Sequence, residues 1–145
     1  INALVASDFV LIPCQSEPVS LASLEHLLRR LQPLRDCDLL SHLRVLGVLA
    51  NMVPSAGYAD GSVERTALSE AKKVAAKLWG APVHFFKTMM RRDENYTKAS
   101  RHLRANEALR LGIYYSAVRD DFTELTTEIH PRIKHESRDV AGVLA

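Results

Sequence analysis

The feature that most constrains this chain is a pair of short, uncharged apolar runs, each ending at a residue that disfavours a strand. Residues 9–12 (FVLI) stop at Pro13, and residues 45–50 (VLGVLA) stop at Asn51. Continuous apolar runs of this length are typical of strands that are buried on both faces of a parallel sheet. Because residues 83–90 predict a third such strand, the sequence indicates an α/β fold.

Helical periodicity fills the intervals between the predicted strands. Leucines recur at spacings of three and four over residues 21–34, which predicts a helix with Ser20 as its N-cap. Residues 67–78 predict a second helix, with Gly80 as its carboxyl cap. We therefore expect a mostly parallel sheet with helices on both faces and right-handed crossovers.

The rest of the chain extends this pattern. A basic helical stretch is predicted over residues 94–109, and a last helix over residues 121–129 is expected to stop at Pro131. The 145 residues show no internal repeat and no interdomain linker, and this length suits a single domain. Residues 1–145 are therefore expected to belong to one domain.

Sequence motifs for catalysis are absent. None of the six glycines precedes a lysine, and neither GxGxxG nor GxSxG occurs. The six histidines are dispersed, and Cys14 and Cys37 form no CxxC pair, so we expect reduced thiols and no metal site. No apolar run approaches the ~20 residues that cross a membrane. We therefore expect no catalytic residue, and ligand contacts only where predicted strands end, at residues 13–18, 51–59 and 90–95.

Charge is unevenly distributed along the chain, although the net charge is only +2. Residues 87–110 carry seven basic and three acidic side chains. A local positive surface on a nearly neutral protein attracts polyanions.

Three segments of the sequence resemble the ParA/MinD family, the deviant-Walker P-loop ATPases of plasmid and chromosome partition. Residues 2–15 (NALVASDFVLIPCQ), followed by SLASL at residues 20–24, are similar to the family's asparagine-alanine-leucine segment, strand and leucine-rich helix. Residues 46–53 (LGVLANMV) look like its next core strand, and residues 87–93 (KTMMRRD) like a later one. The chain departs from the family pattern at Lys98, where the family has glutamate.

The resemblance implies that this chain is the carboxyl-terminal part of a P-loop ATPase domain. In the family the Walker A loop, which grips the phosphates, lies upstream of the segment at residues 2–8. ATP and Mg²⁺ would then be cofactors of the full-length protein, and we expect this chain alone to bind neither and to hydrolyse no ATP.

The resemblance also implies nucleotide contacts. Asn51 would hydrogen-bond the adenine edge, with Met52, Met90 and Arg91 beside the ring. Gln15 and Glu17 would lie in the loop that approaches the nucleotide and the dimer mate. The alternatives are a turn-forming asparagine, core methionines and an ordinary surface loop.

Family members bind DNA without sequence preference once ATP has dimerised them, through lysines and arginines that contact phosphates. The candidates here are Arg65, Lys72, Lys73, Lys77, Arg91, Arg92, Arg101 and Arg104. A solvated helix face explains the three lysines equally well. The partners implied are non-specific DNA, a second copy and a ParB-like protein, with a cytoplasmic, nucleoid-associated location and no membrane anchor.

Two other interpretations remain open. The chain can be a stand-alone, non-catalytic module of the same fold that binds DNA or protein, or part of a metabolic relative similar to cobyrinate synthase. An upstream reading frame that encodes a Gly-Lys-Ser/Thr loop would favour the ATPase over the module.

Overall fold

The computed structural model describes residues 2–54, 57–94 and 116–143. In chain order, its elements are α1 (Asn2–Val5), β1 (Phe9–Cys14), α2 (Pro18–Asp36), β2 (Arg44–Val53), α3 (Val63–Trp79), β3 (Phe85–Arg91) and α6 (Ser116–Val143). None of the described helices combines the length and the apolar character that crossing a bilayer requires.

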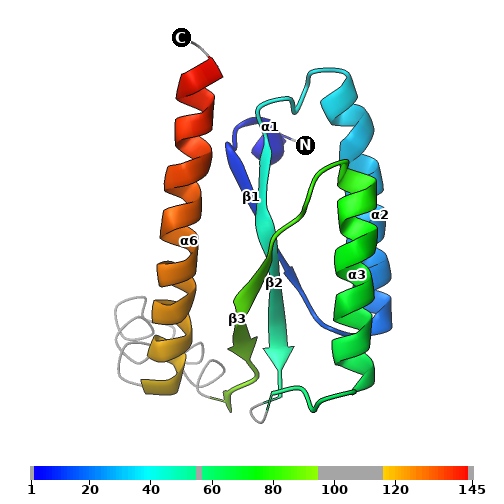
Figure 1. The fold of residues 1–145 in the computed structure, drawn as a ribbon, viewed down its shortest axis with the longest axis vertical. Coiled ribbons are helices and arrows are strands. Elements are labelled where there is room, and N and C mark those ends of the chain that lie inside the picture. Colours follow the sequence, from blue (N-terminus) through cyan, green and yellow to red (C-terminus); the bar gives the residue numbers. More distant parts are fainter. Residues whose placement is uncertain (1, 55–56, 95–115, 144–145) are drawn as a thin grey trace.

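The three described strands form one parallel sheet in the order β1-β2-β3. Helices α2 and α3 lie on one face of this sheet, and α6 covers the other (Figure 1). Both crossovers therefore lie on one face, as expected when strands are added in one direction by connections of the same hand. The predicted α/β fold with a parallel sheet between two helical layers is confirmed.

Two apolar clusters hold these layers together. The larger joins leucines of α2, among them Leu28, to Ala71 and Trp79 of α3 and to Val48 of β2. The smaller lies under α6 and consists of Leu46, Leu49, Phe86, Met90 and Leu125. Strand β2 thus contributes to both clusters, which confirms that the apolar run at residues 45–50 is buried on both faces.

A register shift in β2 explains the glycine within its apolar run. Val10 pairs with Val45 but Leu11 pairs with Gly47, so Leu46 is an extra residue in the ladder. A Cβ atom at Gly47 would lie 2.6 Å from a ring carbon of Phe86 and 2.9 Å from the carbonyl oxygen of His84. Only glycine allows β3 to approach this closely.

The strands extend beyond the predicted stops. Strand β1 continues through Pro13 to Cys14, and β2 continues through Asn51 to Val53. Pro13 is tolerated because, among the described residues, β1 has a neighbour on one side only. The predicted ends of both strands were therefore wrong by two or three residues.

Two expected helix ends also differ from the structure. Helix α2 begins at Pro18 with Glu17 at its N-cap, not after Ser20, because a proline in the first turn gives up no intrahelical hydrogen bond. Pro131 lies inside α6 instead of ending it. Leu125 and Ile129 pack on the sheet before Pro131, and Arg132 Nε donates to the Leu46 carbonyl after it, so contacts on both sides hold the helix.

The predicted carboxyl cap of α3 is confirmed. Gly80 has a left-handed φ of 72° and donates its N–H to the Ala76 carbonyl. Most of the predicted basic helix at residues 94–109 lies outside the described residues.

Candidate functional site

The carboxyl ends of β1 and β2 and the first turns of α2 enclose a cavity of about 390 Å³, here called the rim cavity. Its polar lining comes from Cys14, Gln15, Ser20, Ser23 and Asn51. This edge is where open parallel sheets bind ligands. The structure therefore brings together Gln15 and Asn51, two residues that are 36 positions apart in the sequence.

The polar groups of the described residues that line the rim cavity are two carboxamides, two hydroxyls and the Cys14 thiol, and no charged side chain lines it. The Asn51 Oδ1 accepts a hydrogen bond of 2.9 Å from the Met52 amide. Its Nδ2 has no protein partner among the described residues, and it remains available as a donor. A cavity with this lining suits an uncharged planar group with alternating donors and acceptors, such as a nucleobase.

The backbone beside Asn51 has an uncommon conformation. Met52 has a left-handed φ of 57°, and its side chain is among the exposed large apolar groups at 47%. A non-glycine residue in this region is strained by about 1–3 kcal/mol, and such residues cluster at ligand sites. Met52, which is both strained and exposed, directly follows Asn51, a residue that lines the rim cavity.

Two buried polar groups lie where the chain enters α2. The Cys14 Sγ donates to the carbonyl oxygens of Gln15 at 3.3 Å and Ser20 at 3.5 Å, and burial raises the pKa of this thiol. Both Cys14 and Cys37 are free thiols. The Ser16 Oγ is buried and has no hydrogen-bond partner among the described residues, which is costly unless a ligand or water satisfies it.

The remaining candidates for nucleotide contact lie elsewhere. Glu17 is the exposed N-cap of α2 and does not line the rim cavity. Met90 is buried in the smaller apolar cluster under α6. The Arg91 guanidinium forms a 3.0 Å ion pair with Asp121, whose side chain is only 3% exposed, and the Arg91 amide donates to the same carboxylate.

Some of the basic residues predicted to contact DNA lie on α3, and the others lie elsewhere in the chain. Lys72, Lys73 and Lys77 are exposed on α3, whereas the Arg65 side chain pairs with Asp60. Arg92 is exposed, and its amide donates to the Val53 carbonyl at 2.7 Å. Arg101 and Arg104 lie outside the described residues.

A carboxylate that the sequence analysis missed joins α6 to β3. Glu128 accepts hydrogen bonds from the Lys87 amide, the Thr88 amide and hydroxyl, and His84 Nε2, at 2.9–3.1 Å. Burial favours the protonated acid, but these donors outweigh it and lower the pKa of Glu128 to about 2. The donors lie 40 to 44 residues away in sequence, so no local pattern could have indicated them.

The two consecutive amides that face Glu128 come from an irregularity in β3. Val48 and Ala50 of β2 pair with Phe85 and Met89, so more residues of β3 than of β2 fill this interval. The described residues contain no group of three or more His, Cys, Asp or Glu side chains that could hold a metal ion.

Comparison with known proteins is limited. No protein-family model matches the chain. An uncharacterized protein of Methanocaldococcus jannaschii is 37% identical over 51 residues, a match that covers 35% of this chain and 20% of that relative. The chain thus matches about a fifth of the relative's length.

Proposed function

We propose that the chain is the carboxyl-terminal part of a ParA-like ATPase of plasmid or chromosome partition, in which it supplies the base end of the nucleotide site and a DNA-binding face. One observation carries this proposal: the carboxamides of Gln15 and Asn51 line one uncharged cavity at the carboxyl ends of neighbouring parallel strands. The resemblance assigns the same two residues to the nucleotide.

In this proposal the rim cavity receives the adenine. The Nδ2 of Asn51 donates to a ring nitrogen, because the Oδ1 is occupied by the Met52 amide. The Gln15 carboxamide, which is exposed, has a donor and an acceptor for the remaining edge. A phosphate-binding loop, which the 145 residues lack, would hold the triphosphate and Mg²⁺, so this chain alone would not hydrolyse ATP.

Nucleotide binding tests the first half of the proposal. In the full-length protein, Asn51→Ala should weaken ATP binding about fivefold, because one hydrogen bond to the base contributes about 1 kcal/mol. The measurement is titration with a fluorescent ATP analogue. Asn2→Ala, on α1, is the matched control, and equal affinities for wild type and Asn51→Ala would contradict the adenine role.

DNA binding tests the second half. Lys72 and Lys73 are better probes than Arg91, whose guanidinium already pairs with Asp121. Replacing both lysines with alanine should lower the slope of log affinity against log salt by about 2, since each phosphate contact contributes roughly 0.9. Filter binding with DNA of mixed sequence gives the slope.

The control for the DNA experiment removes two exposed positive charges from the opposite face of the sheet, with Arg119→Ala and Lys134→Ala in α6. An unchanged slope in the α3 variant would remove these lysines from the interface. The dimer, the ParB-like partner and the nucleoid location are proposed from the resemblance alone. If no longer protein with a phosphate-binding loop exists, the stand-alone binding module becomes the better interpretation.

A further inference from the structure

The rim cavity has more polar lining than a base alone requires. The proposed function uses the carboxamides of Gln15 and Asn51, but the hydroxyl side chains of Ser20 and Ser23 on α2 line the same cavity. Ser20 is half-buried and Ser23 is exposed. Small-molecule sites place a few polar groups among apolar ones, and these polar groups fix the orientation of the ligand. The two hydroxyls are therefore available for a second part of the ligand.

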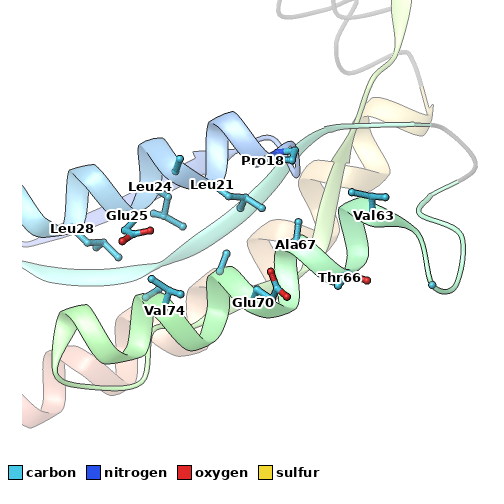
Figure 2. A pocket seen from close by; sticks show the side chains of 14 residues that line it. Pro18, Leu21, Leu24, Glu25, Leu28, Val63, Thr66, Ala67, Glu70 and Val74 are labelled. Atoms are coloured by element: carbon cyan, nitrogen blue, oxygen red, sulfur yellow. The ribbon is translucent and has the colours of Figure 1, made fainter.

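The periodicity of α2 directs these serines toward the rim cavity. Four α2 residues line it, at the spacing i, i+3, i+4 and i+7 of one helix face: Ser20, Ser23, Leu24 and Leu27. The neighbouring face of α2 lines a different hollow, of about 510 Å³, and Figure 2 shows its residues Leu21, Leu24 and Leu28 on the side of α2 toward α3. Neither serine is among the described residues that line that second hollow.

The structure leaves both serine hydroxyls able to bind a ligand. An N-cap role would tie the Ser20 hydroxyl to the backbone, but α2 begins at Pro18, and the Ser20 Oγ has no hydrogen-bond partner among the described residues. The Ser23 Oγ donates to the Val19 carbonyl at 3.0 Å and keeps its capacity to accept. The Cys14 Sγ donates to the Ser20 carbonyl at 3.5 Å, which fixes this turn of α2 against the end of β1.

A pair of adjacent hydroxyls on a ligand matches this pair of serines. Side chains three positions apart on a helix have Cβ atoms about 5–6 Å apart, so two neighbouring ligand hydroxyls can reach both serines. One ligand hydroxyl donates to the Ser23 Oγ, and the other exchanges a hydrogen bond with the Ser20 Oγ, which can donate and accept. No charged side chain is among the described residues that line the cavity, so a sugar suits it better than a phosphate does.

We infer that Ser20 and Ser23 form a ribose subsite of the rim cavity and that they select ribonucleotides over deoxyribonucleotides. This inference rests on the proposed function, because it takes the base to lie at Gln15 and Asn51. In a nucleotide the sugar lies between the base and the phosphates. It therefore occupies the part of the cavity that α2 lines, and the phosphates extend out of the cavity.

The test compares ATP, 2′-deoxy-ATP and 3′-deoxy-ATP as ligands of the full-length protein, with dissociation constants measured by titration calorimetry. Wild type should bind each deoxy analogue about fivefold more weakly than ATP, because the missing hydroxyl leaves one serine without its partner. Ser20→Ala combined with Ser23→Ala should bind all three nucleotides with equal affinity, and alanine is well tolerated inside a helix. Equal binding of the three nucleotides by wild type, or a double variant that still prefers ATP, would overturn the inference.

Two further variants separate the ribose subsite from the base contact. Ser41→Ala combined with Ser69→Ala removes two exposed serine hydroxyls outside the rim cavity and should keep the wild-type preference for ATP. Asn51→Ala should weaken all three nucleotides by the same factor, since it removes a contact with the base. If Asn51→Ala has this effect but wild type does not discriminate, the ribose subsite is wrong and the proposed function stands. If wild type binds none of the three nucleotides, both are wrong.

Discussion

Glu128 shows how one side chain can attach a helix to a sheet. Its carboxylate accepts hydrogen bonds from two backbone amides and one hydroxyl of β3. The carboxylate is 20% exposed, so solvent screens the interaction in part. We estimate its contribution to stability at neutral pH as on the order of 2 kcal/mol.

The lowered pKa of Glu128 predicts a pH dependence of stability. The pKa is about 2 in the folded chain, against an ordinary value of 4.5, so the stabilisation is present above pH 4.5 and is lost as the pH falls toward 2. Glu128→Gln should therefore lower the free energy of unfolding by about 2 kcal/mol at pH 7 and much less near pH 2.

Urea unfolding at a series of pH values measures this difference. Glu124→Gln, on an exposed position of the same helix, is the control and should leave the pH profile unchanged. A constant gap between wild type and Glu128→Gln at all pH values would contradict the assigned pKa.

Gly47 gives a second prediction about a single residue. Gly47→Ala should destabilise the chain by about 3 kcal/mol, because its Cβ meets the Phe86 ring and the His84 carbonyl oxygen at less than 3.0 Å. Gly61 has a left-handed φ of 73°, but a Cβ atom there would meet nothing within 4 Å, so Gly61→Ala should lose only about 1 kcal/mol. Thermal unfolding of both variants measures the two losses of stability. Equal losses for Gly47→Ala and Gly61→Ala would show that the close approach of β3 is not the reason for glycine at position 47.

Helix α6 is joined to strands β2 and β3 by polar contacts as well as by apolar packing. Along α6, Asp121 pairs with Arg91, Glu128 binds the amides of β3, and Arg132 donates to the Leu46 carbonyl. These positions are separated by seven and four residues, so they lie on one face of the helix. Leu125 occupies the same face and supplies the apolar contact between them.

The pair of Arg91 and Asp121 predicts coupled stability effects. Because Asp121 is buried, Arg91→Ala should cost about 2 kcal/mol by leaving its carboxylate without a counter-charge. The same substitution in an Asp121→Asn background should cost at least about 1 kcal/mol less, since no charge then remains to be compensated. Urea unfolding of the four proteins gives the coupling energy, and additive losses would show that the ion pair contributes nothing to the docking of α6.

The three-stranded sheet predicts the behaviour of the whole chain in solution. Among the described residues β1 pairs only with β2, and its sequence (FVLIPC) contains no charged side chain. An uncharged edge strand is a template for another strand, so the chain should self-associate at micromolar concentration. Sedimentation velocity over a dilution series measures this, and a monodisperse monomer throughout would contradict it.

The alternation of apolar runs and amphipathic segments was sufficient to predict the α/β class and the parallel sheet, because strands buried on both faces must be apolar throughout. It also predicted the cap at Gly80, which depends on neighbouring residues alone. Prolines were less informative. Pro13 lies inside β1 because no described strand pairs with the outer edge of β1. Pro131 lies inside α6 because contacts with the sheet hold the helix on both sides of it. A local sequence pattern contains neither fact.

The sequence by itself determined which segments form strands and helices and that the strand ends would meet at one edge of a parallel sheet, since hydrophobic period and local backbone preference act over a few residues. Only the tertiary structure decided that Gln15 and Asn51 line one cavity, that Arg91 pairs with Asp121, and that Glu128 binds β3. Those contacts join residues 30 or more positions apart, and their geometry depends on strand register and helix docking, which arise from packing the whole chain at once.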